Sequence, residues 1–255
     1  MPEPIDPSPS PVHAPARTAL VTGGGSGIGA AVVAALAATG THVAVLDRDT
    51  GAVPAVAGVS SHTVDLRDEA ATIAAVRAAV PDGSRLDVLV NAAGIEHVAS
   101  LEQTSAEDWD RVLHTNLRAT FLVLRETLPA LRRARGCVIN VASQLALVGA
   151  ERFAAYTASK AAVLGFTRST ALELAGDGVR VNAVCPGAVD TPLLRRQFAD
   201  GRRGPQGTLD DLVAMHPLGR LATAQEIAEP IVFLAGPGAA FMTGSTLVVD
   251  GGYTA

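Results

Sequence analysis

Residues 18–29 read TALVTGGGSGIG, an apolar run that leads into a glycine-rich turn, and an alanine-rich segment follows to residue 39. Glycines at such a turn let the backbone approach a pyrophosphate, which then rests on the unpaired amides of a helix N-terminus. Asp47 ends the next apolar run, 18 residues beyond Gly29, close to the ~20 expected of a ribose-binding carboxylate. The pattern predicts a strand, a turn and a helix that together bind a dinucleotide.

The rest of the chain alternates short apolar runs with longer helical stretches. Expected strands lie at 18–22, 42–46, 61–64, 86–91, 137–142, 179–185 and 246–249, and expected helices near 27–39, 67–79, 104–133, 154–175 and 223–235. Strands without in-and-out alternation are buried on both faces, as in a parallel sheet covered by helices. We therefore expect an α/β fold: a single doubly wound Rossmann-fold domain whose seven-stranded, mainly parallel sheet is flanked by helices.

Two segments depart from this alternation of strands and helices. Residues 1–16 are rich in proline and have no apolar core, so we expect a disordered tail, no secretory signal, and a domain that spans residues 17–255. Within that domain, residues 187–221 form the longest piece without clear periodicity, and loops of that length are often lids or binding segments. We expect this piece to be a substrate lid.

Composition excludes several function classes. The 255 residues carry a net charge of −5, whereas nucleic-acid binders need clustered Lys and Arg. The uncharged stretch 27–46 has the length of a membrane span, but Gly40 interrupts it as a helix stop, so we expect no membrane segment. The six histidines show no metal-ligand spacing, so no metal is expected. Both cysteines, Cys137 and Cys185, lie in apolar runs, which indicates a reducing cytoplasm.

A tyrosine and a lysine stand out by their spacing. Lys160 is the single lysine among 20 basic residues, and Tyr156 precedes it by four positions in a helical stretch. Residues four apart share one helix face. A phenol, with an ordinary pKa near ~10, becomes a useful acid or base when an ammonium stabilises its phenolate. The spacing therefore predicts an acid/base pair. The alternative without a catalytic role is a surface tyrosine beside an extended lysine.

With these motifs the chain resembles the short-chain dehydrogenase/reductase family over about residues 18–255. The family's TGxxxGxG corresponds to Thr22–Gly29 and its YxxxK to Tyr156–Lys160. Further matches are Asn91–Gly94, the segments Pro186-Gly187 and Asp190-Thr191-Pro192, and the ending Val249-Asp250-Gly251-Gly252. One departure is Ala224, which stands where many relatives carry proline before a helix.

The resemblance implies a role for each of four residues. Tyr156 would be the general acid/base, and Ser143 would hydrogen-bond the substrate oxygen as charge develops there. Lys160 would bind the nicotinamide ribose and lower the tyrosine pKa, and Asn116 would hold a water that links Lys160 to solvent. The alternatives are structural: Ser143 ends a strand, or Asn116 bonds within its helix.

The resemblance also implies the two binding surfaces. The cofactor-binding residues are expected to be Gly23, Ser26, Gly27, Ile28, Gly29, Asp47, Arg48, Asp65, Leu66, Asn91, Ala92, Ala93, Gly94, Tyr156, Lys160, Pro186, Gly187, Val189 and Thr191, with Asp65 placed for the adenine amino group. Those expected to face the substrate are Ser143, Gln144, Leu145, Val148, Gly149, Phe153, Tyr156, Ala188 and Leu193. This mainly apolar set suits a secondary alcohol or ketone, or a polyol or cyclic diol if Gln144 binds a second hydroxyl.

The leading hypothesis is an NAD-dependent oxidoreductase that interconverts a secondary alcohol and its ketone. A carboxylate at Asp47 favours NAD over NADP, although Arg48 beside it softens the repulsion of a 2′-phosphate. One alternative is an NADPH-dependent 3-oxoacyl-[acyl-carrier-protein] reductase, against which Asp47 speaks. Another is a non-catalytic NAD(H)-sensing or scaffold protein, which would need no acid/base pair. The resemblance further implies a homotetramer. The spacing of Trp109 and Phe121 suits a helix packing face, so we expect them in the core or at a subunit contact. His97 follows the Asn91–Gly94 turn, which places it beside the substrate pocket or in a solvated loop.

Overall fold

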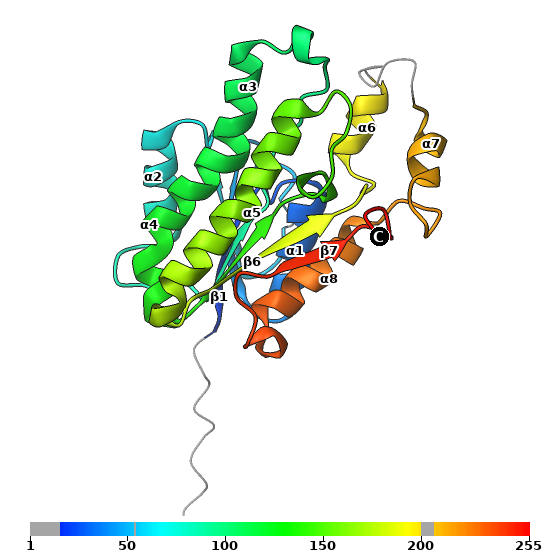
Figure 1. Cartoon of the computed structure of the whole chain (residues 1–255). Coiled ribbons are helices and arrows are strands. Elements are labelled where there is room, and N and C mark those ends of the chain that lie inside the picture. Colours follow the sequence, from blue (N-terminus) through cyan, green and yellow to red (C-terminus); the bar gives the residue numbers. More distant parts are fainter. Residues whose placement is uncertain (1–15, 54, 200–206) are drawn as a thin grey trace, which may run out of the picture.

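A parallel sheet forms the centre of the molecule (Figure 1). The computed structural model describes residues 16–53, 55–199 and 207–255. Within these residues, seven strands pair in the order β3-β2-β1-β4-β5-β6-β7, and every neighbouring pair is parallel. They are β1 (Thr18–Thr22), β2 (His42–Asp47), β3 (Val59–Thr63), β4 (Val88–Asn91), β5 (Cys137–Val141), β6 (Arg180–Pro186) and β7 (Thr246–Val249). The strand order reverses between β1 and β4, where ligands bind beyond the carboxyl ends of the strands.

Helices cover both faces of the sheet (Figure 1). They are α1 (Gly27–Ala38), α2 (Glu69–Ala79), α3 (Ala106–Leu113), α4 (Ala119–Ala134), α5 (Ala154–Leu174), α6 (Pro192–Ala199), α7 (Leu209–Ala214) and α8 (Ala224–Ala235). Helices α1 and α8 pack together on one face, and α2, α4 and α5 lie on the other. The doubly wound Rossmann fold predicted from the sequence is confirmed, and its described strands are all parallel.

Consecutive residues of a strand pack into the core on opposite faces of the sheet. Val21 and Val90 face α1 and α8, whereas Leu20 and Leu89 face the other helical layer, and all four are fully buried. Full burial of such a side chain contributes about 1.5–3 kcal/mol. Because both faces are covered, the strands show no polar alternation, which is why they read as continuous apolar runs.

The long helix expected over 104–133 is interrupted in the structure. Helix α3 ends at Leu113, a π turn spans His114–Arg118, and α4 follows to Ala134. A π turn inserts one extra residue into the helical repeat and often marks a functional site. Apolar periodicity does not reveal so small an insertion, and the turn contains Asn116, which is buried.

The segment 187–221 is also more ordered than its sequence suggests, since it contains α6 and α7. Pro192 opens α6, and Thr208 caps α7 in a reciprocal capping box with Asp211, both ordinary helix-start signals. Residues 200–206 of this segment lie outside the described residues, as does the expected tail except residue 16. Helix α8 begins at Ala224 with Thr223 as its cap, so it starts without the family's proline.

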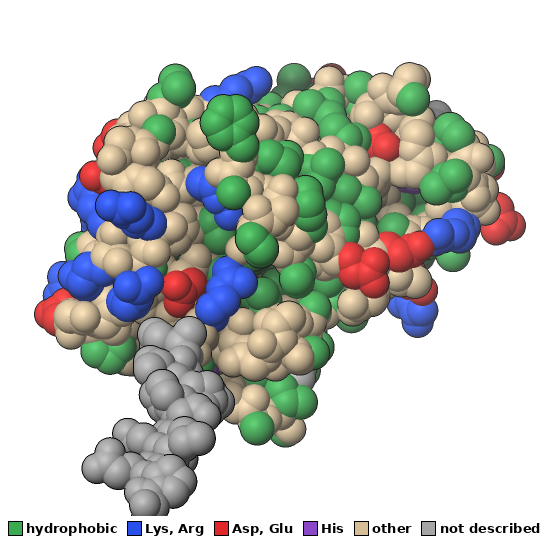
Figure 2. All heavy atoms as spheres, turned by 90° about the horizontal axis from the view of Figure 1, so that it is seen from below, with side chains coloured by type: hydrophobic (Ala, Val, Ile, Leu, Met, Phe, Trp, Pro, Cys, Tyr) green, Lys and Arg blue, Asp and Glu red, His purple; other side chains and the backbone are tan. Residues whose placement is uncertain are grey.

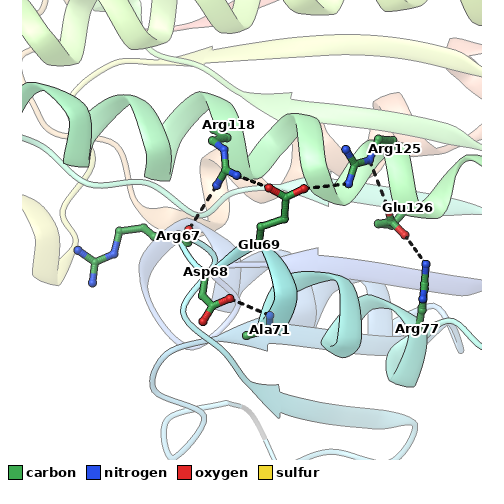
Figure 3. A network of polar contacts seen from close by, with 8 residues as sticks. All are labelled: Arg67, Asp68, Glu69, Ala71, Arg77, Arg118, Arg125 and Glu126. Carbon is green, nitrogen blue, oxygen red and sulfur yellow. Dashed lines mark hydrogen bonds and ion pairs between the residues drawn. The ribbon is translucent and has the colours of Figure 1, made fainter.

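Ion pairs connect α2 to α4 and to the π turn before it on the outside of the molecule (Figure 3). Glu69 pairs with Arg118 and, at 3.4 Å, with Arg125, while Glu126 pairs with Arg77 at 3.4 Å and with Arg125 at 3.1 Å. Exposed pairs of this kind contribute little singly and more as a network.

The face seen from below in Figure 2 presents basic, acidic and apolar side chains intermixed. Of the helices in the described ranges, none is long and apolar enough to cross a membrane. Nor do the described residues contain a cluster of three His, Cys, Asp or Glu side chains placed to hold a metal ion. Both cysteines are buried free thiols.

Candidate active site

The glycine-rich turn between β1 and α1 packs too tightly for a side chain at Gly23 or Gly29. Gly23 has a φ of +71°, and a Cβ on it would lie 2.7 Å from the backbone of Ala93. A Cβ on Gly29 would lie 2.1 Å from the carbonyl oxygen of Gly23. Ser26 caps α1 without a side-chain hydrogen bond, so the first-turn amides are left to an external acceptor. The turn is therefore a cradle suited to a pyrophosphate.

Asp47 stands at the edge of this cradle. Its Oδ2 accepts a hydrogen bond from the Gly25 amide at 2.8 Å, and its Oδ1 accepts one from the Asp49 amide at 3.0 Å. These two contacts fix the carboxylate beside the glycine-rich turn. Since an ionised carboxylate has about four acceptor positions, it retains the capacity to accept hydrogen bonds from a ribose.

A continuous cleft joins the cradle to the ends of β2 and β4. The predicted cofactor residues that line it are Gly23, Ser26, Gly27, Ile28, Gly29, Asp47, Arg48, Asp65, Leu66, Ala92, Ala93, Gly94 and Thr191. Basic side chains that the sequence reading did not assign, Arg67, Arg111 and Arg196, line it too. The cradle, the carboxylate and these cations fit a dinucleotide, which carries two riboses and two phosphates.

Asp65, expected near an adenine, is engaged by a neighbour. Both of its carboxylate oxygens accept hydrogen bonds from Arg67, the shorter at 2.6 Å. This guanidinium holds the pKa of Asp65 below its ordinary value. The structure places Asp65 in the cleft as an ionised member of an exposed pair.

Tyr156, Lys160 and Ser143 meet in a second cavity that adjoins the cleft. Tyr156 and Lys160 come from α5, one turn apart, and are 9% and 4% exposed. Ser143 follows β5 and caps the short turn Gln144–Ala146 (η3), where its Oγ accepts a hydrogen bond from the Leu145 amide at 3.1 Å. A hydrogen bond with Ser143 also stabilises the Tyr156 phenolate. The three side chains predicted to act together thus line one buried cavity.

Burial is the largest cause of the pKa shifts of Tyr156 and Lys160. It raises the pKa of Tyr156, the nearby Glu96 carboxylate raises it further, and the Ser143 hydrogen bond opposes them. Burial lowers the pKa of Lys160 to about 8, and its Nζ donates to the Val141 carbonyl at 2.7 Å. Lys160 is not among the groups that shift the pKa of Tyr156 in the chain alone, so the lowering by Lys160 that the resemblance implies is not seen there.

Asn116 lies behind the loop that follows β4 and holds this loop by hydrogen bonds. Its Oδ1 accepts from the Ile95 amide at 2.8 Å, and its Nδ2 donates to the Ile95 carbonyl and to Ser159 Oγ, each at 2.9 Å. An added Cβ on Gly94 would lie 3.4 Å from both Asn116 Oδ1 and Lys160 Nζ. Asn116 therefore clamps the loop after β4 and lies close to the lysine.

Most of the predicted substrate residues line the same cavity. These are Ser143, Gln144, Leu145, Phe153, Tyr156, Ala188 and Leu193, together with Pro186, Gly187 and Val189 from the predicted cofactor set. Val148 and Gly149 do not; they are exposed, because the chain turns outward after η3. Asn91 also faces away, since its Nδ2 donates to Asn140 Oδ1 within the sheet at 2.9 Å.

Two polar residues of the cavity wall were missed by the sequence reading. Glu96 comes from the loop after β4, and Gln197 comes from α6. Glu96 directly follows the Asn91–Gly94 motif and its flanking isoleucine, a position that could have drawn attention. Gln197 gave no signal, because its segment was read as a loop.

His97 and Phe121, two other residues considered from the sequence, do not line the cavity. His97 lies outside its lining, with Nδ1 3.8 Å from Asp108. Phe121 is 42% exposed beside Leu117 and Phe166, so it is not a core residue. Of the two roles expected for Phe121, a subunit contact is the one that its exposure permits.

Comparisons with known proteins fit this geometry. The family profile described as Enoyl-(Acyl carrier protein) reductase matches residues 23–254. Curated relatives are D-threitol dehydrogenase of Mycolicibacterium smegmatis, 40% identical over 93% of both chains, cyclopentanol dehydrogenase of Comamonas sp., 38% identical over 94% and 97%, and cis-4-hydroxycyclohexanecarboxylate dehydrogenase of Sinomonas cyclohexanicum, 40% identical over 94% and 97%.

Solved structures superpose along nearly the whole chain. Actinorhodin polyketide ketoreductase with NADPH has a TM-score of 0.87 at 35% identity and covers 93% of this chain and 97% of its own. The 3-ketoacyl-(acyl-carrier-protein) reductase of Brucella melitensis complexed with NADH has a TM-score of 0.85 at 33% identity, with coverage of 94% and 98%. The two structures hold different forms of the nicotinamide cofactor.

Proposed function

Because the chain belongs to the short-chain dehydrogenase/reductase family, we propose that it is an NAD-dependent dehydrogenase that interconverts a secondary alcohol and its ketone. The observation that carries the proposal is the convergence of Ser143, Tyr156 and Lys160 in one buried cavity beside the glycine-rich cradle. A protein that only bound the cofactor would have no need of a buried phenol and ammonium next to it.

The proton route follows from the positions of the side chains. Tyr156 takes the proton of the substrate hydroxyl, and the Ser143 hydroxyl donates a hydrogen bond to the substrate oxygen. A nicotinamide cofactor supplies the hydride acceptor in this chemistry, so the alcohol loses a hydride and a proton and leaves as a ketone. Lys160 binds the cofactor ribose and favours the phenolate, and Asn116 holds a water that links Lys160 to solvent.

Asp47 supports NAD as the cofactor. A carboxylate there accepts hydrogen bonds from the ribose hydroxyls and repels a 2′-phosphate. Its position at 2.8 Å from the Gly25 amide fixes it beside the pyrophosphate cradle. Arg48 and Arg67 line the same cleft. Their positive charges reduce the repulsion between Asp47 and a 2′-phosphate, but they cannot accept hydrogen bonds from the ribose hydroxyls.

The cavity supports a neutral secondary alcohol, either a polyol or a cyclic alcohol or diol. Leu145, Phe153 and Leu193 form apolar wall, whereas Ser143 and Gln144 are polar. We propose that Gln144 binds a second hydroxyl. The curated relatives named for threitol and cyclopentanol act on this chemical class.

The assembly and the compartment are proposals of the same kind. We place a homotetramer contact on α4 and α5, where exposed Phe121 lies beside Leu117 and Phe166, since apolar side chains gathered on a surface mark contact sites. We assign the protein to the cytoplasm, because Cys137 and Cys185 are free thiols and disulfides are rare in that reducing compartment.

The test is the formation of reduced cofactor across a panel of secondary alcohols, polyols and cyclic diols, with NAD and NADP in parallel. We expect turnover with NAD and a lower kcat/KM with NADP. No turnover across the panel by a protein that binds NADH would contradict the proposed activity. A preference for NADP would contradict the role of Asp47.

A further inference from the structure

A buried histidine lies behind the wall of the substrate cavity. His216 is 3% exposed, follows α7 and is not part of the cavity lining. Its side chain is hydrogen-bonded to the backbone of two residues that do line the cavity, Ala188 in the segment after β6 and Leu212 in α7. A single side chain thus connects two parts of the cavity wall that come from different segments of the chain.

The two contacts determine which ring nitrogen of His216 carries the proton. A backbone carbonyl can only accept a hydrogen bond, so Nδ1 donates to the Leu212 carbonyl at 2.8 Å. A backbone amide can only donate, so Nε2 accepts from the Ala188 amide at 3.1 Å. The neutral imidazole with its proton on Nδ1 makes both bonds. His216 is therefore a donor to α7 and an acceptor for the segment after β6.

Ala188 lines the substrate cavity and also a second one, which we call the rear cavity and which is lined by Gly187, Ala188, His216, Leu218, Arg220, Ala222, Glu226, Val249, Asp250 and Gly251. The rear cavity has a volume of about 90 Å³, which is enough to admit water. Backbone bonds hold the neighbouring groups: the Gly187 amide donates to the Val249 carbonyl at 2.9 Å. The Ala188 carbonyl accepts from the Ala222 amide at 3.0 Å. Because space lies on both sides of Ala188, its position depends on such bonds more than on packing.

The surroundings of His216 hold its ring in this orientation. The Tyr253 ring packs against it, with ring centroids 5.1 Å apart, a distance typical of aromatic contacts. The charged residues of the rear cavity are bonded elsewhere. Arg220 donates to Glu226 at 2.8 Å, and the Asp250 carboxylate accepts from backbone amides of the turn that follows it. The imidazole is therefore directed to its two backbone partners.

We propose that His216 is a positioning residue for the alcohol substrate, because its bonds to Ala188 and Leu212 fix two sides of the substrate cavity relative to one another. His216 lines neither the substrate cavity nor the cofactor cleft, so it acts through these two residues. Its effect falls on substrate binding, since Ser143 and Tyr156 are held by other elements, η3 and α5. The inference rests on the proposed alcohol dehydrogenase function and adds to it a residue outside the site.

Three substitutions separate the two bonds. His216→Gln places an amide oxygen near the position of Nε2 and keeps an acceptor for Ala188, whereas His216→Asn places an amide nitrogen near Nδ1 and keeps a donor for Leu212. His216→Phe keeps a ring of similar shape and removes both bonds. The control is His42→Phe, which changes an exposed histidine at the amino end of β2. Thermal unfolding and NADH fluorescence titration establish that each variant is folded and binds cofactor.

The kinetic assay uses NAD with D-threitol and with cyclopentanol. We expect His216→Phe and His216→Asn to raise KM for the alcohol by about three- to tenfold and to change kcat by less than about twofold. His216→Gln should keep KM within about twofold of the wild type, since the Ala188 amide retains an acceptor. NADH affinity should be unchanged in every variant, because neither Ala188 nor Leu212 lines the cofactor cleft. His42→Phe should behave as the wild type.

Hydrogen exchange measured by mass spectrometry supplies a readout that needs no substrate. The bond to His216 Nε2 protects the Ala188 amide, and an amide that loses its partner to water exchanges faster. Peptides that cover residues 187–191 should therefore exchange faster in His216→Phe and His216→Asn than in the wild type. In His216→Gln they should exchange at the rate of the wild type.

An equal rise of KM in all three His216 variants would overturn the inference and assign His216 to packing alone. Unchanged KM values in His216→Phe and His216→Asn would overturn it as well, and so would unchanged exchange at residues 187–191 in both. Absence of turnover by the wild type on these alcohols and on the wider panel would refute the proposed function instead. The exchange rates would then still confirm or overturn the role of His216 at this wall.

Discussion

Replacement of Asn116 by alanine tests whether the π turn positions the active-site loop. The substitution removes three hydrogen bonds, to the Ile95 amide, the Ile95 carbonyl and Ser159 Oγ. Asn116 is 1% exposed, so its former partners lose their bonds in a largely dry region. At roughly 1 kcal/mol for each lost bond, with more for a partner left unsatisfied, we expect about 2–4 kcal/mol less stability.

The assay is thermal unfolding monitored by circular dichroism, together with NADH titration. For a domain of this size the loss corresponds to a fall in Tm of roughly 5–15 °C. NADH affinity should fall as well, because Ile95 lines the cofactor cleft. Thr120→Val is the matched control, since it removes one bond, from Thr120 Oγ1 to the Asn116 carbonyl at 2.9 Å, and should cost about 1 kcal/mol. A Tm for Asn116→Ala no lower than that of the control would refute the reasoning.

Three other substitutions have defined outcomes. Asp47→Ala should raise the NADP-to-NAD ratio of kcat/KM by at least about tenfold, because it removes the ribose acceptor and the repulsion of the phosphate; an unchanged ratio would mean that another group sets the preference. Glu96→Gln should move the pH profile of alcohol oxidation to lower pH, since Glu96 raises the pKa of both Tyr156 and Lys160; a shift to higher pH would contradict this. Glu69→Gln should cost about 0.5–1 kcal/mol in urea unfolding at low salt and much less at 1 M salt; a loss that salt does not reduce would contradict a network of exposed ion pairs.

The strands and the cofactor cradle could be predicted from the sequence because their causes are local. Runs such as Ala19–Val21 and Val88–Val90 are continuously apolar since helices cover both faces of the sheet. Gly23 and Gly29 are required by close backbone contacts. The acid/base pair of Tyr156 and Lys160 follows from one helical turn. Family, fold and the class of activity, an oxidoreductase of CH–OH groups, are confirmed by the relatives, which do not favour the acyl-carrier-protein reductase or the sensing protein.

The features that the sequence did not reveal depend on distant contacts or on single-residue irregularities. The bond between Gln197 and Glu96 joins helix α6 to the loop after β4, two segments that no periodicity relates. The π turn at Asn116 shifts the helix by one residue, which apolar spacing tolerates. Val148 is exposed because the chain leaves the cavity after η3, a direction that neither composition nor motif specifies.

The pKa shifts of Tyr156 and Lys160 could not be predicted from the sequence either. Spacing places Lys160 beside Tyr156, but it does not show that both are buried or that the Lys160 ammonium is bonded to the Val141 carbonyl. Burial raises the pKa of the tyrosine and lowers that of the lysine, the latter to about 8.

The measurement that tests the central claim most directly is the turnover of Tyr156→Phe with NAD and the best alcohol of the panel, beside its affinity for NADH. The account predicts that turnover is lost, because phenylalanine cannot take the substrate proton, while NADH binds within a few-fold of the wild type. Substantial residual turnover in a folded Tyr156→Phe protein would contradict the assignment of Tyr156 as the general base.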